Sequence, residues 1–111
     1  MTVFITANPG QNVSITVQVR NQFGERQNSA SPPSIDFVYS PSLQALSGYP
    51  ANMTNINTGL YTIVFDVPNG TSNLGTYIAS VSWIHPGNGF TQYELFCINV
   101  IYPFSAYSVR A

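Results

Sequence analysis

The segment LGTYIASVSW (residues 74–83) alternates between two sets of side chains, and this alternation decides the fold class. One set comprises Tyr77, Ala79, Val81 and Trp83, and the other comprises Ile78, Ser80, Ser82 and, one residue beyond the segment, Ile84. A period of two residues is typical of a β-strand that turns one face toward a core. The segment therefore predicts a strand whose inward face carries the set that begins with Tyr77.

The segment TGLYTIVFDV (residues 58–67) opens with the same Gly-x-Tyr pattern. At such a strand entry, Gly59 or Gly75 supplies backbone freedom where the chain bends, and Tyr61 or Tyr77 turns its ring inward. The two openings lie sixteen residues apart, which is too short for a duplicated module. A chance repetition of a common frame is the alternative explanation.

Alternating patterns recur along the rest of the chain. They predict strands at residues 2–7, 12–20, 34–40, 59–68 and 90–100. The side chains expected to point inward from the last four are Val13, Ile15, Val17 and Val19; Ile35, Phe37 and Tyr39; Tyr61, Ile63, Phe65 and Val67; and Phe96, Ile98 and Val100. Residues 41–58 are expected to form a loop with at most short strands near 43–46 and 52–56.

No window of eleven residues shows the spacing of an amphipathic helix, and turn signals such as HPGNG (residues 85–89) separate the strands. About seven strands in 111 residues fit an antiparallel β-sandwich better than a closed barrel. The predicted fold class is thus all-β, with a single sandwich over residues 1–100 and an apolar C-terminal segment over residues 101–111.

Charged residues make up only 6% of the chain, against about 25% in an ordinary globular protein. There is no lysine, and the basic residues are Arg20, Arg26 and Arg110. Nucleic acids and anionic membranes are bound through clustered basic residues, so the composition predicts neither partner. The apolar share of 44% is too high for a disordered chain.

The first residues, MTVFITANPGQ, lack the basic start and the apolar run of a signal peptide, and no stretch approaches the about 20 apolar residues of a membrane span. The single cysteine, Cys97, has no partner for an intramolecular disulfide. We expect synthesis in a host cytoplasm and export inside a particle. A domain cut from a larger exported protein is the alternative.

Residue types suited to catalysis are few and are not grouped. His85 lies in a predicted turn, and Cys97 lies within a predicted strand where a half-buried packing role is more common than nucleophilic chemistry. The four carboxylates, Glu25, Asp36, Asp66 and Glu94, show no spacing that pairs them. No metal-binding or phosphate-binding motif is present, so no enzyme activity, metal or cofactor is predicted.

The stretches PGQNVSITVQV, NTGLYTIVFDVP, LGTYIASVSW and YELFCINV together resemble prokaryotic and viral immunoglobulin-like domains. The resemblance covers residues 10–100. It implies an immunoglobulin-like β-sandwich of the kind found in bacteriophage capsid decoration (cement) proteins, in tail and fibre proteins and in bacterial adhesins. The antibody pattern of two cysteines around a tryptophan is absent, so antibody-like recognition is not implied.

The C-terminal segment IYPFSAYSVRA (residues 101–111) is unusually apolar for a free tail. We expect Tyr102, Phe104 and Tyr107 to bind a neighbouring subunit, because aromatic side chains are frequent anchors in protein interfaces. The alternative is that the segment adds a further strand to its own sandwich.

These features predict a structural protein of a virion. The preferred role is a capsid decoration protein that bridges neighbouring subunits, with the major capsid protein, other virion subunits or copies of itself as partners. A tail or fibre component is the next interpretation. A carbohydrate-binding or adhesive domain of a surface protein is the alternative class, with Trp83 as the ambiguous aromatic, although a core position is favoured for it.

Overall fold

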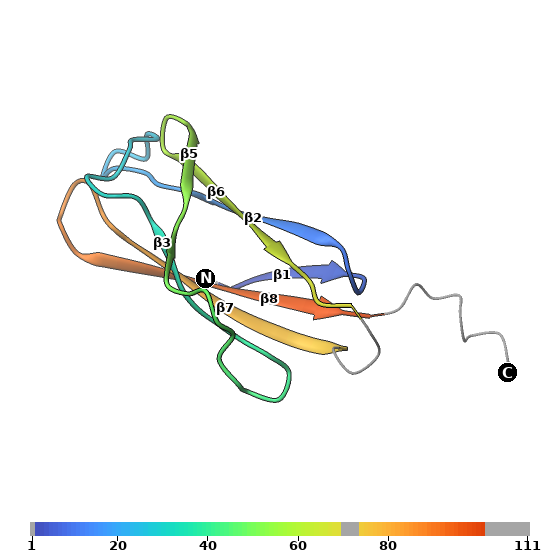
Figure 1. Cartoon of the computed structure of the whole chain (residues 1–111). Coiled ribbons are helices and arrows are strands. Elements are labelled where there is room, and N and C mark those ends of the chain that lie inside the picture. The colour runs from blue at the N-terminus through green and yellow to red at the C-terminus, as the bar shows by residue number, and fades with distance from the viewer. Residues whose placement is uncertain (1, 70–73, 102–111) are drawn as a thin grey trace, which may run out of the picture.

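A computed structural model describes residues 2–69 and 74–101, and all regular structure in these ranges is β-strand. Eight strands follow one another along the chain (Figure 1): β1 (Thr2–Ala7), β2 (Asn12–Gln18), β3 (Ser34–Tyr39), β4 (Ala51–Asn52), β5 (Thr54–Asn57), β6 (Leu60–Asp66), β7 (Gly75–Ile84) and β8 (Thr91–Val100). The all-β prediction is confirmed.

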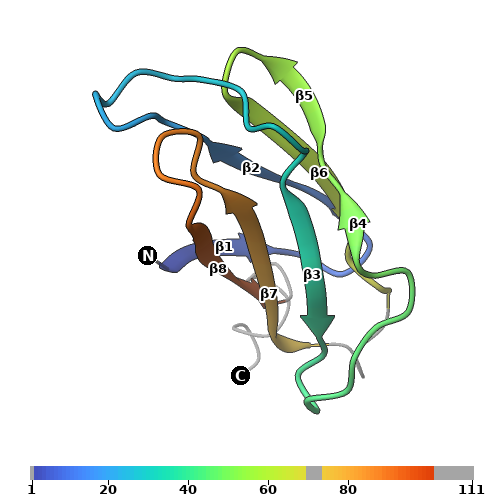
Figure 2. The same ribbon diagram turned by 90° about the vertical axis from the view of Figure 1, so that its left-hand side faces the viewer.

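The strands form two sheets that face each other as the two layers of a sandwich (Figure 1). One sheet has five strands in the order β1-β8-β7-β3-β4, and the other has three in the order β2-β6-β5. Figure 2 shows β3, β7, β8 and β1 side by side. The hairpin of β7 and β8 pairs over its whole length, from Gly75 opposite Val100 to Ile84 opposite Thr91.

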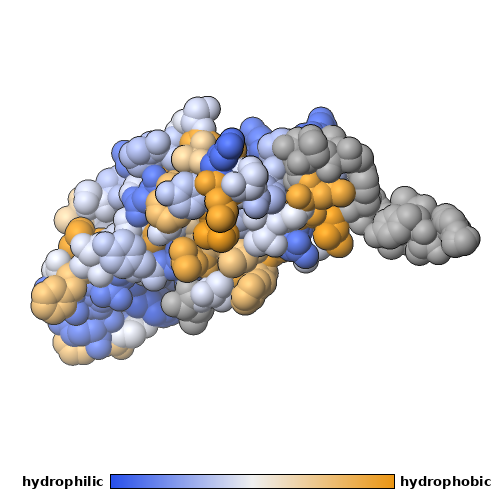
Figure 3. Space-filling view, turned by 90° about the horizontal axis from the view of Figure 1, so that it is seen from below, coloured by the Kyte–Doolittle hydropathy of each residue, from blue (hydrophilic) through white to orange (hydrophobic). Residues whose placement is uncertain are grey.

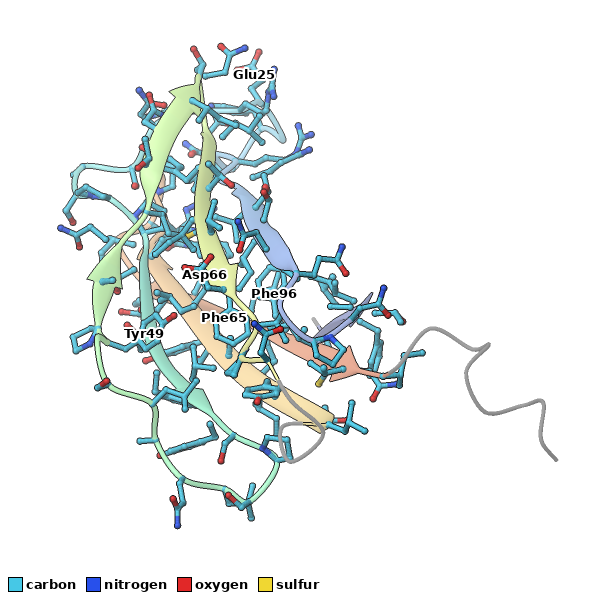
Figure 4. All side chains as sticks on the ribbon, turned by 45° about the vertical axis from the view of Figure 1, so that its right-hand side comes forward. Glu25, Tyr49, Phe65, Asp66 and Phe96 are labelled. Carbon is cyan, nitrogen blue, oxygen red and sulfur yellow. The ribbon has the colours of Figure 1, made fainter. Side chains whose placement is uncertain are left out.

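The core lies between the sheets and is built from the alternating side chains that the sequence predicts to point inward. Ile15, Ile98 and Val81 are fully buried, and Phe65 and Phe96 are almost so (Figure 4). The rings of Phe65 and Tyr77 pack across the two sheets with centroids 5.6 Å apart. The inward faces predicted for residues 12–20, 59–68, 74–83 and 90–100 are therefore confirmed, with Ile63 and Trp83 half-buried at the margin.

The sequence predicted a wholly antiparallel sandwich, and this part of the prediction is wrong. β1 pairs in parallel with β8, from Thr2 opposite Leu95 to Ala7 opposite Val100. A parallel neighbour needs a long connection, and here nearly the whole chain lies between the two strands. The alternation of side chains shows which face of β1 is buried, but it carries no information about the neighbouring strand.

The inward face predicted for residues 34–40 is also wrong beyond its first residue. The pairing of β3 with β7 shifts between Ile35 and Phe37, which marks a β-bulge, and Val38 is buried instead of Phe37 and Tyr39. The extra residue of a bulge moves the following side chains to the opposite face. Phe37 and Tyr39 thus lie on the outer face of the five-stranded sheet.

The stretch expected to be mostly loop, residues 41–58, does contain two short strands near its end. β4 pairs with β3, and β5 pairs with β6 in the other sheet. Only Met53 separates them; it is buried, and its N–H donates to the carbonyl of Pro33 at 2.8 Å. The chain therefore changes sheets at Met53. The described residues contain eight strands, where the sequence predicted about seven.

Both Gly-x-Tyr openings have the predicted geometry. Gly59 and Gly75 have φ angles of +68° and +122°, in the region that favours glycine, and Tyr61 and Tyr77 are buried. A Cβ atom on Gly59 would lie 2.6 Å from the carbonyl oxygen of Val19. Glycine is therefore required at position 59 for two reasons: the backbone angle, and the close approach of the backbone at Val19.

We expect Gly59→Ala to lower the free energy of unfolding by about 1–3 kcal/mol, because alanine is strained at this φ and its methyl group meets backbone atoms. Gly24→Ala is the matched control: Gly24 has a φ of +80°, but nothing lies within 4 Å of its Cβ position. Urea unfolding of both variants separates the free-energy cost of the strained φ angle, which both variants share, from the cost of the methyl contact, which only Gly59→Ala has. An equal loss in both would show that the contact with Val19 is unimportant.

Candidate binding surface

The residues that the sequence singled out for binding and for chemistry are not brought together. Tyr102, Phe104 and Tyr107 lie outside the described residues, so their role stays a prediction. His85 is in the turn after β7, where its Nδ1 accepts hydrogen bonds from the N–H groups of Gly87 (2.9 Å) and Asn88 (3.1 Å). Cys97 is half-buried in β8 opposite Ile78, which precedes His85 by seven residues, so the two side chains are not brought together.

Acidic, histidine and cysteine side chains do not form a metal-binding group of three anywhere within residues 2–69 and 74–101. In the same ranges, no helix is long and apolar enough to cross a membrane. The surface features that remain to be explained are apolar.

The outer face of the five-stranded sheet carries a continuous group of apolar side chains. Cross-strand pairing places Phe4, Cys97, Ile78 and Tyr39 in one row, with Leu95 and Phe37 in the next row and Tyr93 beyond them. We call these seven residues the apolar face. Phe4 is 79% exposed, Tyr93 64% and Leu95 40%, and the other four are half-buried.

Figure 3 views the molecule from this side, and hydrophobic residues gather across its middle. The rings of Phe37 and Tyr39 pack together with centroids 4.7 Å apart. Ser80 lies between Leu95 and Phe37 in the pairing register and is only 6% exposed, so the larger side chains around it cover its hydroxyl group. Contiguous apolar patches of this kind on a soluble domain commonly mark interaction sites.

Charge is nearly absent from the apolar face. The acidic residue at its border is Asp36, beside the β3 bulge, and its Oδ1 accepts a hydrogen bond from the Ser34 hydroxyl at 2.7 Å. Arg20, Glu25 and Arg26 lie in or beside the loop after β2, at the far end of the molecule, where Figure 4 labels Glu25. Contacts made by the apolar face therefore depend on burial and shape, with little contribution from ion pairs.

The outer face of the three-stranded sheet has a different character. Ser14, Thr16 and Thr62 lie on it, and the hydroxyl groups of Thr16 and Thr62 are 3.1 Å apart across β2 and β6. Val64, opposite Ser14, is an exposed apolar residue on this side, and Ile56 on β5 is a second exposed apolar residue of the same sheet. The contrast between the two outer faces indicates that the apolar face is specific to one side of the sandwich.

A shallow pocket of about 180 Å³ adjoins the end of the apolar face. Its lining contains four hydroxyl-bearing residues and one tryptophan: Ser31, Ser34, Ser82, Thr91 and Trp83, together with Pro32 and Ile84. This is smaller than the about 300–1,000 Å³ of pockets for drug-sized ligands. Trp83 packs partly against the core and also borders this pocket, so both interpretations of Trp83 have a structural basis.

Two exposed phenylalanines lie on neighbouring loops at the end of the molecule away from Val100. Phe23 is 77% exposed and Phe90 is 69% exposed. The N–H of Phe23 donates to Asn21 Oδ1, and the N–H of Phe90 donates to Asn88 Oδ1, both at 2.9 Å. Each loop is thus held by a side-chain turn, and each loop exposes one aromatic ring.

Burial perturbs a few titratable groups near the core. It raises the pKa of Tyr77 and the pKa of Tyr49. The negative charge of the nearby Asp66 carboxylate raises the pKa of Tyr49 further. Figure 4 labels Tyr49 and Asp66. Burial also raises the pKa of Glu94, which lies opposite Val81 at the inner side of β8.

The raised pKa of Glu94 predicts a pH dependence of stability. Because folding penalises the ionised form, the free energy of unfolding falls as the pH rises from the usual value of 4.5 through the raised pKa. Glu94→Gln should therefore have a higher Tm than the parent protein around pH 7 and lose that advantage around pH 3. Glu25→Gln, at an exposed site, is the control. A Tm difference that does not change with pH would contradict this role of burial.

The apolar face was not predicted, although the sequence contains one signal for it. In residues 91–100, the outward positions Tyr93, Leu95 and Cys97 are as apolar as the inward positions, so both sides of this strand are apolar. The contribution of Phe37 and Tyr39 had no such signal, because it depends on the bulge. A scan against protein-family models and a search of curated proteins both find no match for this chain.

Proposed function

We propose that this chain is a non-enzymatic structural protein of a virion, with capsid decoration as the preferred role. The observation that carries the proposal is the apolar face on a two-sheet body that is very poor in charge. Such a surface suits a protein that stays bound in an assembly. Its partners would be the major capsid protein or other virion subunits.

The strand order supports an immunoglobulin-like assignment of the sandwich. In that fold one sheet contains strands B, E and D and the other contains G, F and C, with further strands beside C in variable-type domains. The orders β2-β6-β5 and β8-β7-β3-β4 match this arrangement when β2 is taken as B. Immunoglobulin-like modules serve as rigid adaptors, which is the mechanical property that a bridging protein needs.

A decoration protein stabilises a shell through binding that exists only in the assembled state. Any contact made with the assembled shell and not with free subunits shifts the equilibrium toward the shell. Many copies on one lattice also gain avidity from individually weak contacts. A tail or fibre location would use the same contacts, and immunogold labelling of intact particles distinguishes the locations.

The pocket beside Trp83 favours a second candidate, a carbohydrate-binding or adhesive domain. Hydroxyl groups and an aromatic residue are suited to a sugar ring, and the volume of about 180 Å³ admits a single ring. Trp83 is the only tryptophan, so its fluorescence reports on the pocket directly. Saturable changes on titration with monosaccharides would favour this candidate over decoration.

Retention on purified particles should be nearly independent of salt. Ionic screening acts on charges, and its range falls to about 3 Å at 1 M salt, while apolar contacts are not weakened by it. The measurement is the fraction of protein that remains on particles after washing from low salt to about 1 M. Loss of most of the protein over this range would refute attachment through uncharged contacts.

A further inference from the structure

We infer that the turn after β7, residues 85–90, is an acid-sensitive switch: protonation of His85 frees the tip of the turn, Gly87 and Asn88, and loosens its contact with the loop after β2. The inference goes beyond the virion role and does not depend on it, because it concerns the order of one turn in the isolated protein. It rests on the way in which the imidazole ring is bonded within the turn.

The imidazole of His85 holds the tip of the turn by accepting two backbone hydrogen bonds at one nitrogen atom. The N–H of Gly87 donates to Nδ1 at 2.9 Å, and the N–H of Asn88 donates to the same atom at 3.1 Å. Both partners can only donate, so Nδ1 carries no hydrogen and the single ring hydrogen lies on Nε2. The two bonds therefore require the neutral ring.

Protonation of His85 removes the acceptor on which both bonds depend. The imidazolium ion carries a hydrogen on each ring nitrogen and has no acceptor left. Gly87 and Asn88 are exposed, so water can take over their N–H groups once the ring no longer accepts from them. Histidine is the side chain that ordinarily gains its charge between pH 8 and pH 5, so acidification over this range is the stimulus.

The base of the turn does not depend on the imidazole. The N–H of His85 donates to the carbonyl of Phe90 at 2.8 Å, and the N–H of Gly89 donates to the carbonyl of His85 at 2.9 Å. These bonds use backbone atoms alone, so β7 and β8 stay paired in acid. The expected opening is confined to the tip, although it also reaches the N–H of Phe90, which is bonded to Asn88 Oδ1.

The tip of the turn lies against the loop after β2. The position that a Cβ atom on Gly87 would take is 2.9 Å from Gln22 Cδ and 3.0 Å from His85 Cε1, so both side chains lie over Gly87. Movement of the tip thus alters the packing between two loops, which expose the rings of Phe23 and Phe90. Acidification therefore changes the surface at this end of the sandwich.

The loop after β2 is held by the same device, but with a side chain that does not titrate. Asn21 Oδ1 accepts hydrogen bonds from the N–H of Phe23 at 2.9 Å and from the N–H of Glu25 at 3.1 Å. An amide oxygen remains an acceptor at every pH between 5 and 8. The two loops thus form a matched pair within one molecule, and only the turn that contains His85 should respond to acid.

Other charged groups lie on the elements that meet the turn. The loop after β2 carries Arg20, Glu25 and Arg26, and the guanidinium of Arg20 is bonded within that part of the chain, to Gln18 and to the carbonyl of Gly24. β8, which follows the turn, carries Glu94. All four charged groups remain when His85 is replaced, so a variant at position 85 separates their titration from that of the imidazole.

The test is ¹⁵N relaxation of the full-length parent protein on both sides of the titration of His85. The chain has one histidine, so its ring signals give the protonated fraction directly. Order parameters of the Gly87 and Asn88 amides should fall from about 0.85 with the neutral ring to below about 0.6 with the charged ring. Those of Phe23 and Glu25 should stay constant, because Asn21 holds them at both pH values.

His85→Asn is the matched variant, because it places at position 85 the acceptor that the other loop uses. Acidification should leave the order parameters of its Gly87 and Asn88 amides unchanged. If protonation of His85 leaves the tip of the parent protein as rigid as before, the inference is overturned. An equal loss of order in His85→Asn would overturn it too, because another group, such as Glu94, would then be the cause. If the variant does not fold, the comparison of the two loops within the parent protein decides alone.

Discussion

Replacing Phe65 by alanine is expected to lower the free energy of unfolding by about 3–5 kcal/mol. Phe65 lies on β6 between the two sheets, is 3% exposed, and packs against the ring of Tyr77 from the opposite sheet. The substitution removes this contact and leaves a cavity that the surrounding strands can fill only in part. Because small domains have about 5–15 kcal/mol of stability in total, the loss is readily measured by urea or thermal unfolding.

Val64→Ala is the matched control for Phe65→Ala. Val64 precedes Phe65 on β6 but points outward, opposite Ser14, and is 53% exposed. Its truncation should change the free energy of unfolding by no more than about 0.5 kcal/mol. If the two variants unfolded at the same denaturant concentration, the inward and outward faces of β6 would be reversed.

The strands and most of their buried faces could be predicted because burial on one side of a sheet leaves a period of two in the sequence. Tyr77, Ala79 and Val81 on β7 and Phe96, Ile98 and Val100 on β8 are buried as their alternation indicates. The glycines before Tyr61 and Tyr77 were predictable for a local reason, since their positive φ angles are a property of the turn itself.

Two features could not be predicted because they depend on the partner strand. The bulge between Ile35 and Phe37 exists only in the register with β7, and the parallel pairing of β1 depends on β8. Both features contribute to the apolar face: the bulge places Phe37 and Tyr39 on it, and the parallel register sets Phe4 opposite Cys97. The candidate binding surface was thus less predictable than the core, although its residues are as apolar.

Removing residues 102–111 is expected to leave a folded sandwich and to lower occupancy on the particle by at least about thirtyfold. The core ends at Val100, and Ile101 is kept in the truncated chain because its N–H completes the link to Ala7 at the end of β1. The deletion removes Tyr102, Phe104 and Tyr107, the predicted partner-binding residues. Aromatic anchors in an interface contribute about 2 kcal/mol or more each, so the loss of even one of them has this effect.

The two interpretations of the C-terminal segment give opposite results for the truncated chain. If the segment docks on a neighbouring subunit, the Tm of the isolated protein stays unchanged and occupancy on the particle falls. If it adds a strand to its own sandwich, truncation exposes the edge of β1 or the core beneath it, so the Tm falls and aggregation increases. Replacing Tyr102, Phe104 and Tyr107 by serine at full length is the control for chain length. A lowered Tm with normal occupancy would refute docking, because the segment would then stabilise only its own domain.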